Sequence, residues 1–267
     1  MQHLSNSELK QTAANYEKLM VPALFTPWAE QLLDASGFRP GHRLLDVACG
    51  TGIVARTAAQ RAGASSSSII GLDPNPGMIS VARGAAPELD WREGAAETLP
   101  FDDQSFDIVT SQFGLMFFED RQAALREMQR VVTPGGCLVV SVFDDLANIP
   151  GYRAMAEIVE QVAGEDVAAI LQMPFSLGDA ETLKTLCSDS GLSNAEVMTR
   201  DGTARFPDSR TMVLADVRGW FPLADISLDD EQIDEIVRRL DSALSAYRAP
   251  DGSLSFPMPA HLIVMKP

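Results

Sequence analysis

The segment from Leu44 to Gly52, which reads LLDVACGTG, combines an acidic residue with two glycines at the spacing of a ligand-binding turn. Its nearly continuous apolar beginning is typical of a buried strand in a parallel sheet. Gly50 and Gly52 have no Cβ atoms, so a ligand can approach the backbone there, and the following helix presents its N-terminal amides to that ligand. The sequence therefore predicts a site for a polar ligand at the carboxyl end of this strand.

Two aspartates near this turn suit different parts of a ligand. Asp46 lies inside the strand, where a buried carboxylate needs a cationic or hydrogen-bonding partner, and the ammonium group of a ligand would supply one. Asp73 ends the next predicted strand about 20 residues past the glycines, where its two oxygens can accept from both hydroxyls of a ribose. Asp73 also precedes Pro74, so capping of the next helix is the alternative interpretation.

The same turn also fits a second class of protein. Read alone, GTGIVA over 50–55 satisfies the GxGxxA pattern of dinucleotide-binding proteins, which makes an NAD(P)-dependent oxidoreductase one alternative. Asp46 argues against it, and the sequence has no YxxxK pair for short-chain hydride transfer. A non-catalytic protein that keeps a cofactor-binding fold is the other alternative.

The elements that position this turn alternate between short apolar strands and helices. The pattern predicts helices over 53–62, 76–83 and 121–131, and strands over 43–48, 68–72, 90–93, 106–112 and 137–143. Such alternation implies right-handed crossovers and a doubly wound α/β sheet. A glycine-rich turn over 133–136 leads into the last of these strands.

Helical segments flank this region on both sides. The first 36 residues predict two or three short helices broken by Pro22 and Pro27. Later residues predict helices over 150–171, 179–190, 208–220 and 229–248, one long strand or a strand pair over 195–206, and a last strand over 260–265. A small loop is predicted at Ser65–Ser68. We expect the late helices to form a lid over the edge of the sheet that binds the ligand.

Four segments give the chain a resemblance to a known family. LLDVACGTG, GLDPNPGMI, REGAAETLPFDDQSFDIV and REMQRVVTPGGCLVVSV follow one another in the order and spacing of the motifs of class I S-adenosylmethionine-dependent methyltransferases. The chain looks most like the small-molecule branch that includes the ubiquinone and menaquinone biosynthesis methyltransferases. The resemblance is close over residues 40–143 and loose outside them.

The resemblance implies a Rossmann-like, mostly parallel seven-stranded sheet, capped by the N-terminal and late helices. It implies a methyltransferase domain over residues 37–267 with helical lid insertions around 145–190 and 207–250, preceded by an N-terminal helical cap segment over 1–36. S-adenosyl-L-methionine would be the cofactor and S-adenosyl-L-homocysteine its product. The partner would be a small molecule that is methylated at an O, N or C atom.

The resemblance also implies roles for single residues. Asp46 and the backbone around Ala48 and Gly50 would hold the ammonium and carboxylate of the methionine moiety, Asp73 the ribose, and Met78 an adenine face. Similar proteins usually have an aspartate at the position of Ala95, so recognition of the adenine amino group must come from elsewhere. The residues expected to bind the cofactor are Tyr16, Asp46, Ala48, Gly50, Gly52, Asp73, Pro74, Met78, Ala95, Ala96, Glu97, Gln112 and Phe113.

Candidates for the catalytic step are fewer. Gln112 and Phe113 follow the 106–112 strand and are expected to meet the methyl acceptor, and the candidates for a catalytic role are Tyr16, Gln112 and His261. Other chemically active residues have structural interpretations instead: Phe117 and Phe118 in the core, His3 and His42 in solvent, and Cys49 packed under the glycine turn rather than acting as a thiol.

Charge and composition exclude several partners. Lys and Arg total 21 against 37 for Asp and Glu, and the net charge of −16 repels nucleic acid backbones and anionic lipid headgroups. Cys49, Cys137 and Cys187 are widely separated, so we expect no metal site and a reducing, cytoplasmic location. The sequence contains no run of about 18 apolar residues that would span a membrane and no signal peptide core. A homodimer is left open.

Overall fold

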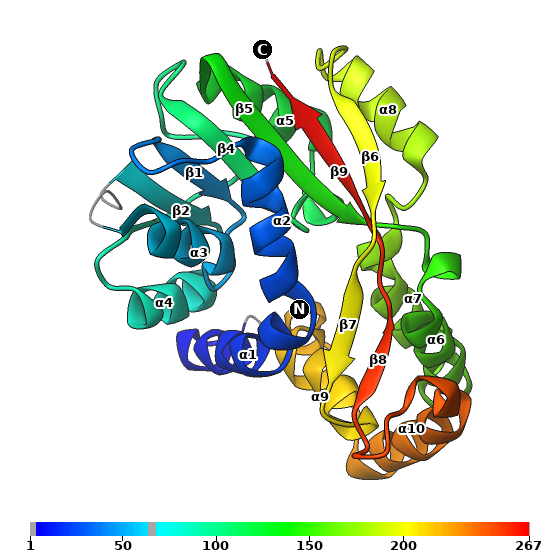
Figure 1. The fold of residues 1–267 in the computed structure, drawn as a ribbon. Helices are drawn as coiled ribbons and strands as arrows, with labels where there is room; N and C mark the ends of the chain where they lie inside the picture. The colour runs from blue at the N-terminus through cyan, green and yellow to red at the C-terminus, as the bar shows by residue number, and fades with distance from the viewer. Residues whose placement is uncertain (1–3, 64–67, 267) are drawn as a thin grey trace.

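The computed structural model describes residues 4–63 and 68–266, so His3 and the predicted loop, apart from Ser68, lie outside the described residues (Figure 1). The strands are β1 (Leu44–Val47), β2 (Ile69–Asp73), β3 (Asp90–Glu93), β4 (Phe106–Gln112), β5 (Val132–Phe143), β6 (Glu196–Arg200), β7 (Thr203–Phe206), β8 (Leu254–Pro257) and β9 (Ala260–Met265). The α-helices are α1 (Asn6–Leu19), α2 (Thr26–Ser36), α3 (Ile53–Ala62), α4 (Pro76–Ala85), α5 (Arg121–Val131), α6 (Pro150–Ala163), α7 (Glu165–Gln172), α8 (Ala180–Asp189), α9 (Ser209–Gly219) and α10 (Asp230–Ala243). Shorter helical turns are η1 (Val21–Phe25), η3 (Leu115–Phe117), η4 (Leu146–Asn148), η5 (Met173–Phe175), η6 (Phe221–Ala224) and η7 (Ser245–Tyr247).

Seven strands form one sheet in the spatial order β3-β2-β1-β4-β5-β9-β6. β9 pairs antiparallel with both β5 and β6, whereas the other pairs in this sheet are parallel. The chain moves from β1 outward to β2 on one side and returns to β4 on the other. The carboxyl ends of β1 and β4 therefore flank the crevice where sheets of this type bind ligands. The doubly wound, mostly parallel seven-stranded sheet that the sequence predicts is confirmed.

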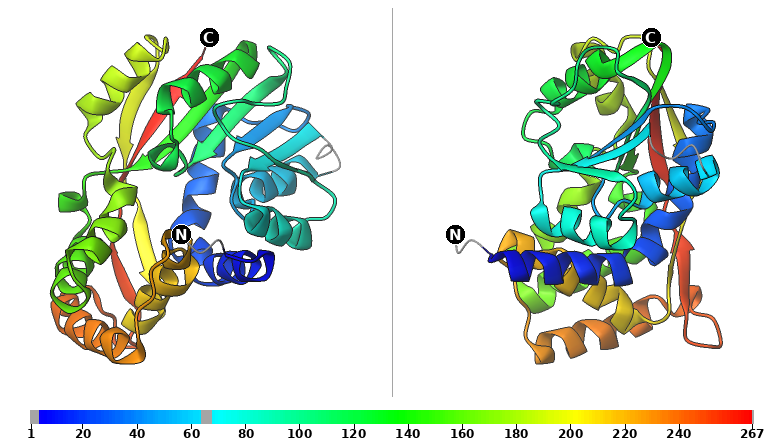
Figure 2. Two further views of the ribbon diagram at one scale, coloured as in Figure 1. Left: turned by 180° about the vertical axis from the view of Figure 1, so that it is seen from behind. Right: turned by 90° about the vertical axis from the view of Figure 1, so that its left-hand side faces the viewer.

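Helices cover both faces of the sheet. α2, α3 and α4 pack on one face, and α5 and α8 pack on the other (Figures 1 and 2). The central strands are accordingly apolar on both sides, and Leu45, Val109 and Val139 are fully buried. This packing holds the carboxyl edge of the sheet as a rigid platform.

A second group of elements, which we call the lid, faces that carboxyl edge (Figure 1). It consists of α6, α7, α9, α10 and the two-stranded ribbon of β7 and β8. The ribbon continues the sheet, because only two residues separate β6 from β7 and β8 from β9. α1 packs against α4 and also against α9, so it bridges the sheet part and the lid. α8, which falls within the predicted lid segment 145–190, packs against α5 instead.

The start of the chain follows its helix signals. Ser5 and Glu8 form a capping box that opens α1. Pro22 and Pro27 lie in the first turns of η1 and α2, where proline is tolerated because its missing N–H would have no helical partner. The predicted short helices broken at these prolines are confirmed.

The late region differs from the prediction in three places. The helix predicted over 150–171 is two helices, because Gly164 adopts φ 97° and ψ 166° and ends α6 before α7 begins. The helix predicted over 229–248 ends at Ala243. Of the two forms predicted over 195–206, one long strand or a strand pair, the structure has the pair, β6 and β7, but β7 pairs with β8, a strand that the sequence pattern did not predict.

The turn predicted over 133–136 lies inside β5. Phe106 pairs with Val132 and Ile108 pairs with Cys137, so β4 advances by two residues (108 − 106) while β5 advances by five (137 − 132). The glycine-rich segment is therefore a bulge in the strand rather than a turn before it.

Within the lid, the packing of α6 against the ribbon of β7 and β8 gives a first prediction. Gly151 lies in the first turn of α6, and a Cβ placed there would lie 2.3 Å from the ring of Phe256 in β8. Gly151→Ala is expected to lower the free energy of unfolding by about 1 to 3 kcal/mol, because the ring must move. Gly84→Ala is the matched control: this glycine of α4 has no atom within 4 Å of the added Cβ, so alanine should raise stability by up to about 1 kcal/mol. Urea denaturation measures both, and a neutral Gly151→Ala would contradict the packing argument.

Candidate active site

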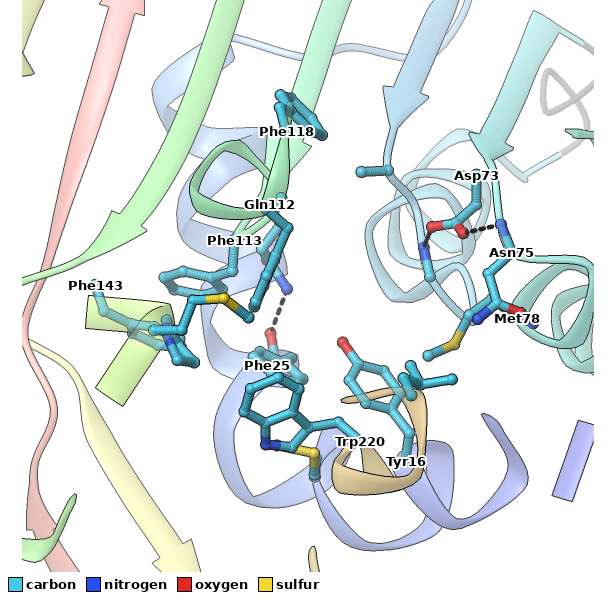
Figure 3. Close-up of a pocket in the computed structure, with 18 of the residues that line it drawn as sticks. Tyr16, Phe25, Asp73, Asn75, Met78, Gln112, Phe113, Phe118, Phe143 and Trp220 are labelled. Carbon is cyan, nitrogen blue, oxygen red and sulfur yellow. Dashed lines mark hydrogen bonds between the residues drawn. The ribbon is translucent and has the colours of Figure 1, made fainter. Parts of the chain in front are cut away.

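A cavity of about 620 Å³ lies between the carboxyl edge of the sheet and the lid (Figure 3). The turn after β1, the ends of β2 and β4, and α1 line it on the sheet side, and α6, α7 and α9 line it on the lid side. All residues expected to bind the cofactor line this cavity except Asp46 and Gly52. They are Tyr16, Ala48, Gly50, Asp73, Pro74, Met78, Ala95, Ala96, Glu97, Gln112 and Phe113.

The turn after β1 has a left-handed backbone at Ala48, Gly50 and Gly52, with φ values of 54°, 56° and 87°. This conformation costs little for glycine but strains alanine, so the structure holds backbone strain at the edge of the cavity. A Cβ at Gly50 would lie 3.7 Å from the hydroxyl oxygen of Tyr16, which shows that Tyr16 faces the turn.

Gly52 serves packing rather than ligand approach. A Cβ at Gly52 would lie 2.2 Å from the ring of Trp91 in β3, and a Cβ at Gly71 in β2 would lie 2.4 Å from the same ring. The expectation that Gly52 lines the binding site is therefore wrong. Its missing side chain makes room for the indole that supports the turn from below.

Asp73 ends β2 and lines the cavity. Its Oδ2 accepts a hydrogen bond from the Gly50 amide at 2.8 Å, and its Oδ1 accepts from the Asn75 amide at 2.8 Å. A carboxylate can accept about four hydrogen bonds, so both oxygens keep capacity for ligand hydroxyls. The N-cap of α4 is Asn75, whose Oδ1 accepts from Gly77 and Met78, so the alternative interpretation of Asp73 as a helix cap is wrong.

Asp46 lies beneath the turn, with 1% of its surface exposed, and does not line the cavity. Its Oδ1 accepts from the Thr110 hydroxyl at 2.9 Å, whereas Oδ2 has no partner among the described residues. Asp46 therefore does not reach the cavity directly, and its expected contact with a ligand stays a prediction. A buried carboxylate oxygen without a hydrogen-bond donor is costly, and a cationic ligand group at the turn would reduce that cost.

Tyr16 and Phe25 form the wall opposite the turn. Their rings stack with centroids 5.3 Å apart (Figure 3). Burial, together with the negative charge of Asp73, raises the pKa of Tyr16 well above its usual value. The phenol therefore keeps its proton and can donate a hydrogen bond, and its candidate catalytic role stays a prediction.

Gln112 and Phe113 end β4 at the centre of the cavity. The side-chain amide of Gln112 donates to the Phe25 carbonyl at 3.2 Å, and its Oε1 is buried without a partner among the described residues (Figure 3). Phe113 has φ 54°, and its amide donates to the Ser141 carbonyl at 3.0 Å. Its ring stacks on Phe143 at 3.9 Å, so the turned backbone extends an aromatic wall from β4 to β5.

His261 is not at the cavity, so its candidate catalytic role is wrong. The imidazole is 3% exposed and contacts the Gly178 carbonyl at 2.8 Å through Nε2 and the Thr199 hydroxyl at 3.0 Å through Nδ1. Nε2 also lies 3.2 Å from Asp144. Both ring nitrogens are occupied in holding β9 to its neighbours, and no face is left for a substrate.

The structural interpretations of Cys49, His42, Phe117 and Phe118 have different outcomes. Cys49 is buried, and burial raises the pKa of its thiol well above the usual value, in agreement with a packing role. His42 is half-buried, with Nδ1 accepting from the Arg39 amide. Phe117 and Phe118 both line the cavity. Phe117 is 46% exposed beside Trp220, which corrects its assignment to the core, whereas Phe118 packs against the core as expected.

The lid and the segments that adjoin it contribute residues that the sequence did not identify. Tyr152 of α6, Phe175 of η5, Asp216 of α9, Trp220 and Met258 also line the cavity. No motif marks them, because they come from distant segments whose helical pattern only indicates amphipathic helices. Asp216 is the unexpected member, since it carries a buried carboxyl into an aromatic surface.

Comparisons with known proteins agree with this geometry. The family model of a methyltransferase domain matches residues 45–140. The ubiquinone/menaquinone biosynthesis C-methyltransferase UbiE of Cellvibrio japonicus is 32% identical over 209 residues, which cover 71% of this chain and 84% of that protein. The demethylmenaquinone methyltransferase of Renibacterium salmoninarum is 42% identical over 116 residues, covering 43% of this chain and 47% of that protein.

Solved structures share the fold at lower identity. The YcgJ protein of Bacillus subtilis has a TM-score of 0.58 at 20% identity, covering 88% of this chain and 96% of that chain. An S-adenosylmethionine-dependent methyltransferase of Thermotoga maritima has a TM-score of 0.52 at 23% identity, covering 73% of this chain and 84% of that chain. The chain belongs to the class I S-adenosylmethionine-dependent methyltransferases, whose cofactor is S-adenosyl-L-methionine. The oxidoreductase alternative is not favoured.

The residues at the turn fit this cofactor. Oδ2 of Asp46, which has no partner among the described residues, suits a nearby cation, the carboxylate of Asp73 has capacity for two hydroxyls, and Gly50 lines the cavity. Within residues 4–63 and 68–266, no helix is long and apolar enough to cross a membrane. The same residues contain no group of three or more His, Cys, Asp and Glu side chains that could hold a metal ion.

The buried carboxyl of Asp46 gives a pH prediction. Burial raises its pKa to about 7, whereas an aspartate in the unfolded chain titrates near about 3.9. The folded state therefore binds the extra proton between about pH 4 and pH 7, and the contribution of Asp46 to stability is lost as pH rises through that window. The unfolding free energy of Asp46→Asn, measured relative to that of the wild type, should therefore rise from pH 4 to pH 7. The rise should be about 1.4 kcal/mol for each unit by which the pKa of Asp46 differs between the folded and unfolded states. Urea denaturation across this range tests it, and a difference that stays constant with pH would contradict it.

Proposed function

We propose that this methyltransferase methylates a small hydroxylated aromatic molecule, which binds between the cofactor and the lid. One cavity with two chemically different ends carries the proposal. The carboxylate of Asp73 and the backbone of Gly50 lie at one end, and the rings of Phe113, Phe143 and Phe175 surround the other. Stacked aromatic walls complement a flat, largely apolar ring, and the two ends share one continuous space.

The curated relatives support the same class of acceptor. The relatives from Cellvibrio japonicus and Pseudoalteromonas translucida are named as C-methyltransferases of ubiquinone and menaquinone biosynthesis. A quinone in its reduced form is a hydroxylated aromatic ring, which is the kind of molecule that the lid end of the cavity suits. We therefore propose a ring carbon next to a hydroxyl group as the methylated atom.

The sheet side of the cavity provides the proposed cofactor site. Asp73 accepts from the ribose hydroxyls, and Met78 and Pro74 pack on the adenine. Position 95 is an alanine and lacks the carboxylate usual there in similar proteins, so the backbone at Ala96 carries the polar contact to the ring. The cofactor supplies an electrophilic methyl group on a positively charged sulfur.

The aromatic residues around that methyl group would exclude water and align the acceptor. Methyl transfer is an in-line displacement, so positioning accounts for much of the catalysis. Tyr16, Phe25 and Phe113 form connected rings at the junction of the two ends, and aromatic faces attract a cationic sulfur. The unpartnered Oε1 of Gln112 offers a hydrogen-bond acceptor at the same junction.

Further proposals concern partners and the division of the chain. The net charge of −16 supports a small-molecule acceptor rather than a nucleic acid, whose phosphates it would repel. Residues 1–36 and the lid segments contribute to the acceptor end together with Phe113 and Phe143, whereas residues 40–143 provide most of the proposed cofactor site. We propose that the terminal and late segments determine which acceptor is used.

Calorimetry and a methylation assay test the function together. The protein should bind S-adenosyl-L-methionine and S-adenosyl-L-homocysteine and show no comparable affinity for NADH. With the cofactor present, it should transfer a methyl group to at least one member of a panel of hydroxylated benzenes, naphthalenes and quinols. Tight binding of NADH alone would support the oxidoreductase alternative, and cofactor binding without any methylation would support the non-catalytic alternative.

The role of Asp73 gives a mutational prediction. Asp73→Ala removes the proposed hydrogen bonds to the ribose, each worth about 1.5 to 3 kcal/mol because the acceptor is charged. The affinity for S-adenosyl-L-homocysteine should therefore fall at least tenfold, by calorimetry. Asp90→Ala is the matched control, since Asp90 is an exposed carboxylate at the start of β3 that pairs with Arg92. Equal affinities of the two variants would mean that the ribose contact is misassigned.

A further inference from the structure

Asp216 is the one carboxyl group that the lid contributes to the cavity lining, among the residues that the structure describes. Its side chain projects from α9, and only 2% of its surface is exposed. Its Oδ1 accepts a hydrogen bond from the indole nitrogen of Trp220 at 3.0 Å, and its Oδ2 accepts from the Tyr152 hydroxyl at 3.4 Å. Each oxygen thus has one hydrogen-bond donor and retains capacity for a second.

For a residue with only a structural role, this arrangement would be destabilising. Two neutral hydrogen bonds hold the carboxylate, and among the described residues no cation contributes to its electrostatic environment. Burial of a carboxylate without a cation costs stability, and an amide or an apolar side chain would fill the same place at lower cost. Groups kept at such a cost are most often found where a protein binds or transforms a ligand.

The neighbours of Asp216 fix its orientation toward the acceptor end of the cavity. Tyr152 is itself buried, and its pKa is raised well above the usual value by burial and by Asp216, so it remains a hydrogen-bond donor. The ring of Tyr152 packs 5.4 Å from that of Phe175, and Trp220 lies beside Phe117. The carboxylate therefore sits at a fixed point of an aromatic surface, with rings on either side of it.

We propose that Asp216 is a catalytic residue that accepts a hydrogen bond from a hydroxyl group of the methyl acceptor and then takes its proton. The inference rests on the proposed function, because it assumes that the acceptor binds at the lid end of the cavity. It adds a feature of substrate recognition: the acceptor must present an O–H to α9 while its ring lies against the aromatic wall.

The proposed step is balanced as follows. The O–H bond of the acceptor breaks, its proton moves to a carboxylate oxygen of Asp216, and the electron pair stays on the acceptor. The neighbouring ring carbon forms the bond to the methyl group, and the carbon–sulfur bond breaks with its electron pair going to sulfur. The ring proton is then lost to solvent, and the proton on Asp216 returns to the oxygen. Burial raises the pKa of Asp216 to about 7, which makes its carboxylate a stronger base than an exposed aspartate.

The test measures binding of a matched pair of probes, 2-naphthol and 2-methoxynaphthalene, by calorimetry with S-adenosyl-L-homocysteine present. The two probes differ in whether they can donate a hydrogen bond. The wild type should bind 2-naphthol about tenfold or more tightly than its methyl ether, the effect expected for a hydrogen bond to a charged group. Asp216→Asn should lose most of this preference, because the amide has no negative charge.

Asp225→Asn is the control for the substitution itself. Asp225 is exposed just after η6, does not line the cavity and has φ 58°, which asparagine tolerates. This variant should keep the wild-type preference. Comparing two probes on two proteins isolates the coupling between Asp216 and the hydroxyl from the difference in probe size.

Two outcomes would overturn the proposal. One is a wild type that binds S-adenosyl-L-homocysteine but shows no preference for 2-naphthol, a result that does not depend on any variant folding. The other is an Asp216→Asn protein that keeps the full preference or methylates hydroxylated acceptors at the wild-type rate. Failure of the wild type to bind S-adenosyl-L-homocysteine is a separate result, which would count against the proposed function instead.

Discussion

The hydrogen bond from the Gly50 amide to the Asp73 carboxylate joins the ends of the first two strands at the edge where the ligand binds. This hydrogen bond depends on the left-handed turn after β1. The ring of Trp91 fills the space beneath that turn. Because three neighbouring strands are tied together there, the turn is held open without a ligand. The strain at Ala48 is sustained by this surrounding packing, as expected where a backbone is prepared for binding.

The cavity joins two environments that the protein builds in different ways. The end near the turn is made by strand ends and backbone amides, which are rigid because the sheet is buried on both faces. The end near the lid is made by side chains from the separate lid helices and from the ends of β4 and β5, with Tyr16 and Phe25 spanning the junction. Buried carboxyls occur at both ends, in Asp73 and Asp216. Burial raises the pKa of both carboxyls, and each retains hydrogen-bonding capacity for a ligand.

The similarity to known methyltransferases follows the same division. The family model covers residues 45–140, which contain the turn and the strands around it. The lid lies outside that range, and its residues select what is bound opposite the cofactor in the function proposed above. A shared cofactor preserves one end of the cavity, whereas acceptors of different shape need different lids.

The sequence by itself determined the order of strands and helices as far as β5, and it identified most of the residues that line the sheet side of the cavity. Apolar runs, turn residues and glycine spacing act over short distances along the chain, so they can be recognised in the sequence alone. It misassigned Gly52 and His261, since whether a glycine faces a ligand or an indole, and whether a histidine has free nitrogens, depends on neighbours distant in the chain. Only the tertiary structure placed Asp216 against Tyr152 at the cavity. The two residues are 64 positions apart on different helices, and neither helix has a sequence pattern that indicates the other.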